Sequence, residues 1–437
     1  MNDATPPAGA DRWLARLAFA IAAAAVVVLL AVAGVRGGIG LLAIGAAGLA
    51  AGAAGLWWFL ARRGVLRWLA AALALAAPAT AAALYARAGL LWLVLVCAVL
   101  WSLAGAAGRA ALARTRDAGG TPAFETLPPH HPFLIMNPRS GGGKVGRFDL
   151  VGKARVLGAE VFLLGGPDPV DVAGVARTAV RRGADLLGVA GGDGTQAIVA
   201  AVAAECGIPF MVISAGTRNH FAMDLGLDRD DPATCLDALT DGVELRVDLG
   251  LIGERTFVNN ASFGAYAFVV QSPAYRADKT ATTLDLLPDV LTGHRGSRLR
   301  LGIGPLVVSG PQAVLISNNP YAAGDIAGLG RRARLDGGVL GVLAVRVAGA
   351  TDTMRLLRGR RSKMLTIVTA TEVIVDGDAP SIPVGVDGEA VSMPTPVRCA
   401  IRPGALRVRV PRNRPGTVAL RPSTDWDRLR RLAMPAG

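Results

Sequence analysis

Apolar residues follow two different patterns along the chain, and the change comes near residue 110. The first part holds four uncharged stretches, at Leu17–Val35, Gly37–Ala61, Trp68–Ala86 and Ala88–Gly108. Each is close to or above the ~18 to 20 residues that a helix needs to cross a lipid bilayer. A water-soluble helix bundle would need polar faces, which these stretches lack. The pattern predicts a transmembrane domain of four helices over residues 1–110.

Arginines around these stretches predict the orientation of the domain. Most of them flank the first and last stretches or lie between the second and third: Arg12, Arg16, Arg62, Arg63, Arg67, Arg109, Arg114 and Arg116. The other two connections carry only Arg36 and Arg87. Because basic residues favour the cytoplasmic side, we expect a multi-pass protein of the inner (plasma) membrane with both termini and the later domains in the cytoplasm. The second stretch also contains small residues that favour close helix packing, namely Gly45, Gly48, Gly52 and Gly55.

Beyond a linker at 111–131, short apolar runs alternate with helical periods. Strands are expected at Phe133–Met136, Glu160–Leu164, Asp185–Ala190 and Pro209–Ser214, and helices at Val170–Arg182 and Gln196–Glu205. This alternation predicts an α/β domain with a Rossmann-like parallel sheet over 132–245. The later pattern is of the β type, at Ala313–Ser317, Val339–Val347, Leu365–Ala370, Glu372–Asp376 and Val397–Ile401. It predicts an all-β sandwich over 246–410.

Composition limits the partners and the compartment. The chain has 437 residues, of which 52% are hydrophobic and 18% charged, too apolar for an ordinary soluble protein. Four of its 46 basic residues are lysines, and more than half of the net charge of +13 lies within residues 1–120. The later part has no basic run interleaved with aromatic residues, so no nucleic-acid partner is expected. Four cysteines without a CxxC or zinc spacing fit a reducing compartment.

Glycine-rich segments follow three of the predicted strands, at 137–144, 191–195 and 216–217. We expect them to cluster, because the carboxyl ends of parallel strands share one edge of a sheet. Closely spaced glycines let backbone N–H groups approach an anion, while Thr195 and Thr217 add hydroxyl donors and the helix at Gln196 adds its positive end. Phosphate is the expected ligand. Lys144 is placed to reach it, although the spacing is not GxxxxGK[ST] and Val145 follows the lysine.

These segments, in this order, resemble the diacylglycerol kinase catalytic-domain family, which includes sphingosine and other lipid kinases. The matching residues are Asn137-Pro138-Arg139-Ser140-Gly141-Gly142-Gly143-Lys144, Gly191-Gly192-Asp193-Gly194-Thr195, Gly216-Thr217-Arg218-Asn219-His220-Phe221-Ala222 and Asp387-Gly388-Glu389. Val247–Gly250 and Phe257–Asn260 resemble the family's entry into its second domain. The resemblance covers roughly residues 131–410 and implies ATP at the glycine-rich edge, a lipid on the β domain, and a segment 411–437 that returns to the first domain.

The resemblance also implies roles for single residues. ATP and Mg²⁺ are the expected cofactors, and the residues expected at the nucleotide are Asn137, Ser140, Gly141, Gly142, Lys144, Gly191, Gly192, Asp193, Gly194, Thr195, Gly216, Thr217 and Asn219. Glu389 is the expected catalytic base for the lipid hydroxyl; an ordinary Asp-Gly hairpin turn is its alternative. Asp193 is the second expected catalytic residue, organising Mg²⁺ and the nucleotide, with a loop-capping role as its alternative.

Three positions depart from the family's pattern. His220 stands where many relatives have Asp, and Met223 stands where Arg is usual. Gly337 takes the place of an Asp that contributes to an accessory Mg²⁺ site in bacterial members, and the neighbouring Asp336 is one residue away. Because glycine has no side chain to ligate a metal, we predict that this site is absent or altered and assign no metal ligand.

Together these inferences predict a membrane-anchored lipid kinase that transfers the γ-phosphate of ATP to a lipid hydroxyl such as that of diacylglycerol. Two alternatives stay open: an enzyme like NAD kinase, in which a GGDGT loop also occurs, and a non-catalytic membrane regulator that binds nucleotide. The expected partners are the lipid substrate and a bilayer with anionic lipids, with a homodimer left open. A basic cluster is a candidate contact for anionic headgroups or a solvated face, at Arg358, Arg360, Arg361 and Lys363.

Overall fold

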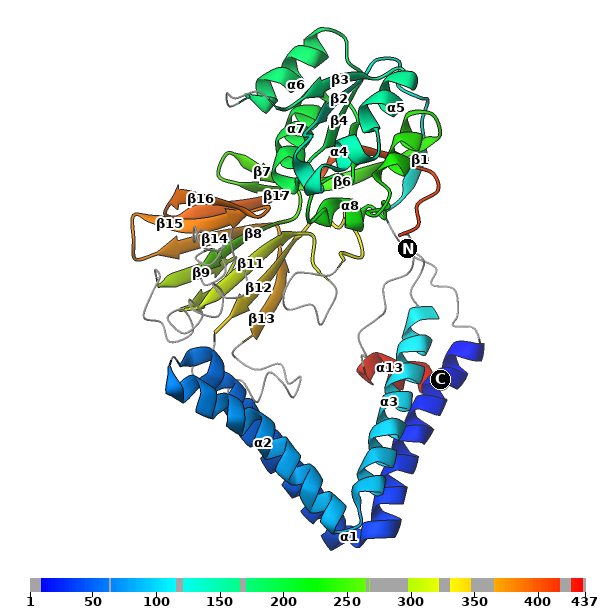
Figure 1. Cartoon of the computed structure of the whole chain (residues 1–437), viewed down its shortest axis with the longest axis vertical. Coiled ribbons are helices and arrows are strands. Elements are labelled where there is room, and N and C mark those ends of the chain that lie inside the picture. The colour runs from blue at the N-terminus through cyan, green and yellow to red at the C-terminus, as the bar shows by residue number, and fades with distance from the viewer. Residues whose placement is uncertain are drawn as a thin grey trace.

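A computed structural model describes residues 9–62, 64–114, 121–165, 170–264, 267, 298–321, 331–346, 365–416 and 426–434. The described chain forms a helical unit, an α/β unit and a β unit (Figure 1). The basic cluster between residues 358 and 363 lies outside the described residues.

The apolar N-terminal stretches form three long helices, α1 (Gly9–Ala61), α2 (Val65–Arg87) and α3 (Leu91–Arg114). All three are long and apolar enough to cross a membrane. The expected count of four helices is not confirmed, because the first two stretches belong to one helix that is broken at Gly34 (φ 66°, ψ 174°). Glycine adopts this conformation at little steric cost, so the expected connection at Arg36 lies inside α1.

The break gives the helical unit the shape of a V (Figure 1), with α3 along the first half of α1 and α2 along the second half. Close packing between α1 and α2 follows from the small residues of α1. A Cβ atom added at Gly55 would lie 2.6 Å from the backbone nitrogen of Ala74, and one at Gly48 would lie 2.9 Å from the Cβ of Ala81. The vertex of the V points away from the other two units.

The α/β unit has the expected parallel strands, β2 (Pro132–Met136), β3 (Glu160–Leu163), β4 (Leu186–Ala190) and β5 (Phe210–Ile213), in the order β3-β2-β4-β5. Strands β2, β4 and β5 are continuous apolar runs because helices cover both faces of the sheet. The larger helices are α5 (Leu150–Val156), α6 (Val172–Arg181) and α7 (Asp193–Cys206). Helices α6 and α7 lie on one face and α5 on the other (Figure 1). This strand order differs from the 3-2-1-4-5-6 order of the Rossmann fold, so that detail of the prediction is not confirmed.

Short elements complete the α/β unit. They are β1 (Ala123–Glu125), a 3₁₀ turn η1 (Ser140–Gly142), α4 (Lys144–Arg147), α8 (His220–Asp224) and a 3₁₀ helix η2 (Pro232–Leu239).

The β unit consists of two sheets that enclose one apolar core. The antiparallel sheet of six strands contains β8 (Asn260–Gly264), β11 (Ala313–Asn318), β12 (Leu340–Val345), β13 (Leu365–Ala370), β15 (Ser381–Val386) and β16 (Glu389–Pro394). The facing strands are β6 (Gly242–Ile252), β7 (Arg255–Phe257), β9 (Leu299–Ile303), β10 (Leu306–Ser309), β14 (Glu372–Gly377) and β17 (Val397–Pro411). The second sheet continues into the parallel strands of the α/β unit.

Strand β17 joins the two units, since its first part pairs with β14 and its last part pairs in parallel with β5. The boundary expected between residues 245 and 246 lies inside β6, which pairs with β17 along most of its length. After β17, the Nε of Arg412 donates to Asp241 and the backbone N–H of Gly416 donates to Gly226, both in the α/β unit. The last helix, α13 (Trp426–Ala433), instead packs on α1 and α3 through the buried Leu429.

Candidate active site

The three glycine-rich segments meet at the carboxyl edge of the parallel sheet, as the sequence predicts, because they follow the adjacent strands β2, β4 and β5. The backbone N–H of Asn137 donates to the carbonyl of Ala190 over 2.8 Å. Gly216 packs so closely on the second segment that an added Cβ would lie 2.6 Å from the carbonyl oxygen of Gly191. The three segments therefore form one continuous surface of backbone.

The first segment is a chain of tight turns. Asn137 accepts a hydrogen bond at Oδ1 from the backbone of Arg139 over 3.0 Å, which fixes the turn after β2. Gly141 and Gly142 both have positive φ, 56° and 71°. Gly141 is packed against the third segment, whereas the Cα of Gly142 faces open space. The Lys144 ammonium donates to the carbonyl of Arg229 over 2.5 Å, at the outer end of this segment.

Helix α7 begins at Asp193, inside the second segment and three residues earlier than expected. The N-cap of this helix is Gly192, which has no side chain, so no side-chain hydrogen bond caps the first turn. An added Cβ at Gly192 would meet nothing within 4 Å. The first N–H groups of α7 thus lie beside open space at the positive end of a 14-residue helix, an arrangement suited to an anion.

The third segment is organised by Asn219. This side chain is buried, and its Oδ1 accepts from the N–H of Gly216 over 2.8 Å. Its Nδ2 donates to the carbonyls of Ser214 and Gly216. Both ends of the amide are therefore used inside the segment, so Asn219 shapes the edge. The neighbouring Thr217 is exposed, while Ser140 and Thr195 are half-buried.

Asp193 connects the second and third segments. Its carboxylate is 8% exposed and accepts from the backbone N–H groups of His220 and Phe221 over 3.3 and 3.4 Å. These are the first N–H groups of α8, so Asp193 has the capping contacts that the sequence analysis held as an alternative. The carboxylate still lies at the start of α7, next to Gly192.

Glu389 lies directly against the second segment, although it is 195 residues further along the chain. A Cβ atom added at Gly194 would collide with the Oε1 and Cδ atoms of Glu389. This contact brings the β unit to the glycine-rich edge and places two carboxylates there, those of Glu389 and Asp193. A side chain at position 194 would displace the Glu389 carboxylate from this place.

The hairpin that carries Glu389 has the two-residue turn expected at Asp387-Gly388. Both residues have positive φ, 47° and 84°, as in a type I′ turn between β15 and β16. The turn is more than a connection, because the Asp387 carboxylate accepts three backbone bonds of 2.8 to 3.1 Å from Val258, Asn259 and Asn260. These bonds fix the turn to the start of β8.

Two titratable groups near the edge have shifted pKa values. Burial, aided by the charge of Asp193, raises the pKa of the Asp387 carboxyl to about 7 against the opposing effect of its three N–H donors. Burial lowers the pKa of the His220 imidazole, while Asp193 and Asp224 oppose that shift. The Nδ1 of His220 is buried and has no hydrogen-bond partner among the described residues.

A buried ion pair that the sequence analysis missed connects α8 to the β unit. The Nη2 of Arg332 lies 2.6 Å from the Oδ2 of Asp224, and both side chains are almost fully buried. Its Nη1 donates to the carbonyls of Val258 and Asn318. Because Val258 also donates to Asp387, the third segment and the Glu389 hairpin are held by one network. The sequence did not point to Arg332, because the chain is rich in arginine and nothing distinguishes this one.

The segment around Gly337 is bound to a neighbouring asparagine. The N–H of Gly337 donates to Oδ1 of Asn319 over 2.8 Å, and an added Cβ would lie 2.6 Å from that oxygen. Asp336 pairs with Arg334 at 2.8 Å. No group of three or more His, Cys, Asp or Glu side chains in the described part of the chain is placed to hold a metal ion.

Residues 131–252, which include all three glycine-rich segments, match the family model of the diacylglycerol kinase catalytic domain. A diacylglycerol kinase of Mycobacterium tuberculosis is 27% identical over 306 residues, which cover 64% of this chain and 94% of that protein. A diacylglycerol kinase of Bacillus subtilis is 36% identical over 96 residues, 22% of this chain and 32% of that protein. A solved diacylglycerol kinase from Bacillus anthracis str. Sterne has a TM-score of 0.46 and 16% identity, covering 65% of this chain and 97% of its own.

Proposed function

We propose that the chain, whose residues 131–252 match the family model of the diacylglycerol kinase catalytic domain, is a membrane-anchored kinase that transfers the γ-phosphate of ATP to a lipid hydroxyl such as that of diacylglycerol. The observation that carries this proposal is the contact between Glu389 and Gly194. It joins a carboxylate of the β unit to the glycine-rich edge, so an acceptor held by one unit meets a phosphate held by the other.

The glycine-rich edge fits a triphosphate. Open space beside Gly142 and Gly192 allows phosphate oxygens to approach the backbone, and the uncapped start of α7 supplies N–H donors. Mg²⁺ is commonly held by one or two carboxylates together with phosphate oxygens, so Asp193 would hold it together with the phosphates and leave Glu389 free to act as a base. When bound, Mg²⁺ would neutralise charge that develops on the phosphates.

In the proposed reaction, Glu389 accepts the proton of the lipid hydroxyl. The hydroxyl oxygen forms a bond to the γ-phosphorus, and the bond from that phosphorus to the β–γ bridging oxygen breaks, so that ADP leaves. Phosphoryl transfer depends mainly on positioning and on charge stabilisation. Asp387 therefore contributes as a positioning residue, because its three backbone bonds hold the turn that carries Glu389.

The helical unit supports the proposed membrane attachment. We propose that the two halves of α1, together with α2 and α3, cross the bilayer as four segments. Arg36 lies just after the Gly34 break and Arg87 ends α2, both at the vertex end of the V, away from the other units. The arginine-rich ends lie toward those units, so the positive-inside rule puts the kinase units in the cytoplasm. The lipid substrate would then be taken from the cytoplasmic leaflet.

The test is a phosphorylation assay with the full chain in detergent micelles and radiolabelled ATP. We expect label in the organic phase when diacylglycerol is present and none when NAD is the acceptor. Label on NAD would instead favour the NAD-kinase-like reaction. Nucleotide binding without transfer to any acceptor lipid in a panel would favour a regulator and contradict the proposal.

A further inference from the structure

Arg332 lies between the two units that the proposed reaction has to bring together. It is almost fully buried and belongs to the segment before β12. On one side it contacts Asp224, the last residue of α8, and on the other side it contacts the residues just before β8. The start of α8 binds Asp193 at the phosphate edge, whereas β8 and the residues before it hold the hairpin of Glu389.

The guanidinium of Arg332 has five N–H donors, and each has an acceptor among the described residues. Its Nε donates to Oδ2 of Asp224 over 2.7 Å, and its Nη2 lies 2.6 Å from the same oxygen. Nη2 also donates to Oδ1 of Asn259 over 3.1 Å. Nη1 donates to the carbonyls of Val258 and Asn318 over 2.7 and 2.6 Å. Because charge-assisted bonds are short and directional, this side chain fixes the residues before β8 relative to α8.

The residues that accept from Arg332 also hold the Glu389 hairpin. Val258 accepts from Arg332 at its carbonyl and donates its N–H to the Asp387 carboxylate over 2.8 Å. Asn259 likewise accepts at its side-chain oxygen and donates its backbone N–H to Asp387. Because Asp387 is two residues before Glu389, a shift of Val258 and Asn259 would move Glu389.

Helix α8 is the fixed end of this connection. Phe221 and Ala222 are fully buried in the core of the α/β unit. The first N–H groups of α8 bind Asp193, beside the start of α7 where phosphate is expected. Asp224 therefore keeps its place when Arg332 is altered, and the hairpin is the part that moves.

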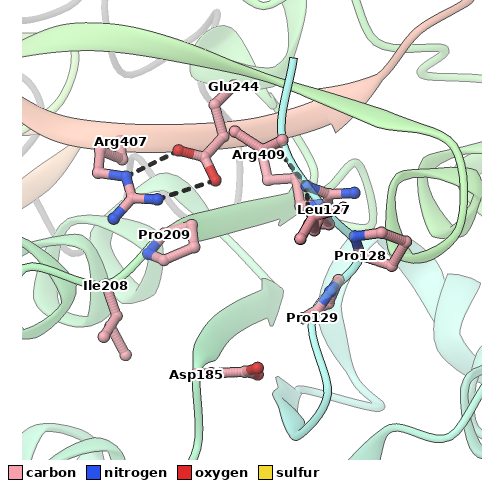
Figure 2. Close-up of a pocket in the computed structure, with 10 residues that line it drawn as sticks. Leu127, Pro128, Pro129, Asp185, Ile208, Pro209, Glu244, Arg407 and Arg409 are labelled. Carbon is pink, nitrogen blue, oxygen red and sulfur yellow. Dashed lines mark hydrogen bonds and ion pairs between the residues drawn. The ribbon is translucent and has the colours of Figure 1, made fainter. Parts of the chain in front are cut away.

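A second arginine–carboxylate pair has similar chemistry in a different place. Arg407 donates twice to Glu244, over 2.7 and 3.1 Å (Figure 2), and so connects the neighbouring strands β17 and β6. The pair lies near Ile208 and Pro209, which precede β5. It is thus at the end of the parallel sheet opposite to the glycine-rich edge, where it holds two strands together.

We propose that Arg332 is a positioning residue for phosphoryl transfer, because its pair with Asp224 sets the place of Glu389 relative to the phosphate edge. This inference rests on the proposed function, in which Glu389 is the base. A displacement of reacting groups by about 1 Å can lower a rate by about 10²-fold. Arg332 therefore contributes to turnover from a buried position, without touching the substrate.

The test is Arg332→Lys in the full chain in detergent, because lysine keeps the charge and has three donors in place of five. We expect kcat for diacylglycerol phosphorylation to fall roughly 10- to 100-fold, while the dissociation constant of ATP stays unchanged. Asp224→Asn alters the pair from the other side and should show the same pattern. Arg407→Lys is the matched control and should keep wild-type turnover. All variants are assayed well below their melting temperatures.

A second measurement separates positioning from a loss of stability. Arg332→Lys is combined with Glu389→Gln, and the turnover of the double variant is compared with that of Glu389→Gln alone. Effects of residues that act through one another are not additive, so we expect the lysine to cause no further fall. A further fall by the same factor as in the wild-type background would show a merely structural role and overturn the proposal.

Two other results would overturn it: wild-type turnover by both Arg332→Lys and Asp224→Asn, or a loss of ATP affinity as large as the loss of turnover. Absence of lipid phosphorylation by the wild type would contradict the proposed function itself, and this inference with it.

Discussion

Glu389 and Asp387 are neighbouring carboxylates for which we propose different roles. Glu389 is exposed and lies against Gly194, where it can meet an acceptor and a phosphate. Asp387 is half-buried and is saturated by three backbone donors, so it holds the hairpin in place. The Asp387-Gly388 hairpin turn, which was the alternative interpretation of this motif, is present. We propose that this turn positions Glu389 for catalysis.

Asp387→Ala tests this positioning role. It leaves three N–H groups without their acceptor, so we expect the free energy of unfolding to fall by about 1–3 kcal/mol. Turnover should fall while nucleotide affinity is kept, because the change moves Glu389 and leaves the glycine-rich edge intact. Urea unfolding, nucleotide titration and lipid phosphorylation measure the three quantities. Asp376→Ala is the control, since that exposed carboxylate bonds to the next residue; equal effects of both variants would contradict the role.

At the scale of elements, the uncapped start of α7 is the feature that we expect to bind phosphate. Gly192→Val tests it, because a Cβ atom added at Gly192 meets nothing within 4 Å, so the side chain enters the open space where we expect the phosphate. We expect nucleotide affinity to fall at least tenfold while thermal stability changes little. Gly302→Val in β9 is the control, since its nearest neighbour for an added Cβ is Ile374 at 3.9 Å. A folded Gly192→Val protein with wild-type nucleotide affinity would contradict the assignment.

The close packing of Gly48 and Gly55 of α1 on α2 gives a second test at the scale of elements. Gly55→Leu would force α2 away, because an added Cβ already lies 2.8 Å from the carbonyl oxygen of Ala70. We expect the melting temperature of the protein in detergent to fall. A Cβ atom added at Gly40 on the same helix meets nothing within 4 Å, so we expect Gly40→Leu to leave the melting temperature unchanged. Equal melting temperatures for the two variants would show that α1 and α2 do not depend on this contact.

Sequence patterns predicted the parallel strands well, because runs such as Phe133–Met136 are apolar on both faces and are followed by glycine-rich segments. They predicted one edge for the three segments, because the carboxyl ends of parallel strands share one edge of a sheet. The count of four helices is not confirmed, because the first two predicted helices form the single element α1, whose two halves meet at the break at Gly34. The Arg332–Asp224 pair was beyond reach, because its partners are 108 residues apart and only the fold makes them neighbours.

At the scale of the whole molecule, two parts of the C-terminal segment bond to different units. Residues 412–416 bond to the α/β unit, whereas Leu429 of α13 is buried against Ala15, Ala111 and Leu112. The Nε of Arg16 also donates to the carbonyl of Ala433 over 3.1 Å. The C-terminal segment therefore links the catalytic units to the helices that we propose to lie in the membrane.

The arrangement predicts that the start of α1, the end of α3 and α13 are on one side of the membrane, with the kinase units. A reporter that is active only in the cytoplasm, fused after Gly437, should be active. A second reporter that is active only outside the cytoplasm should be active when it is inserted at Gly89, in the α2–α3 turn. The reverse pattern would contradict the orientation derived from the arginines.

The most direct test of the account is the paired measurement of nucleotide affinity and diacylglycerol phosphorylation in the same detergent for Glu389→Gln and Asp193→Asn. Glu389→Gln keeps the shape of the side chain and removes the base, so ATP should bind normally while turnover falls by roughly 10²- to 10⁴-fold. Asp193→Asn should lower both affinity and turnover, because Asp193 joins α7 to α8 at the phosphate edge. Near-normal turnover by Glu389→Gln would contradict the role of Glu389 as the catalytic base. Asp387-Gly388-Glu389 would then be an ordinary hairpin turn without a catalytic role.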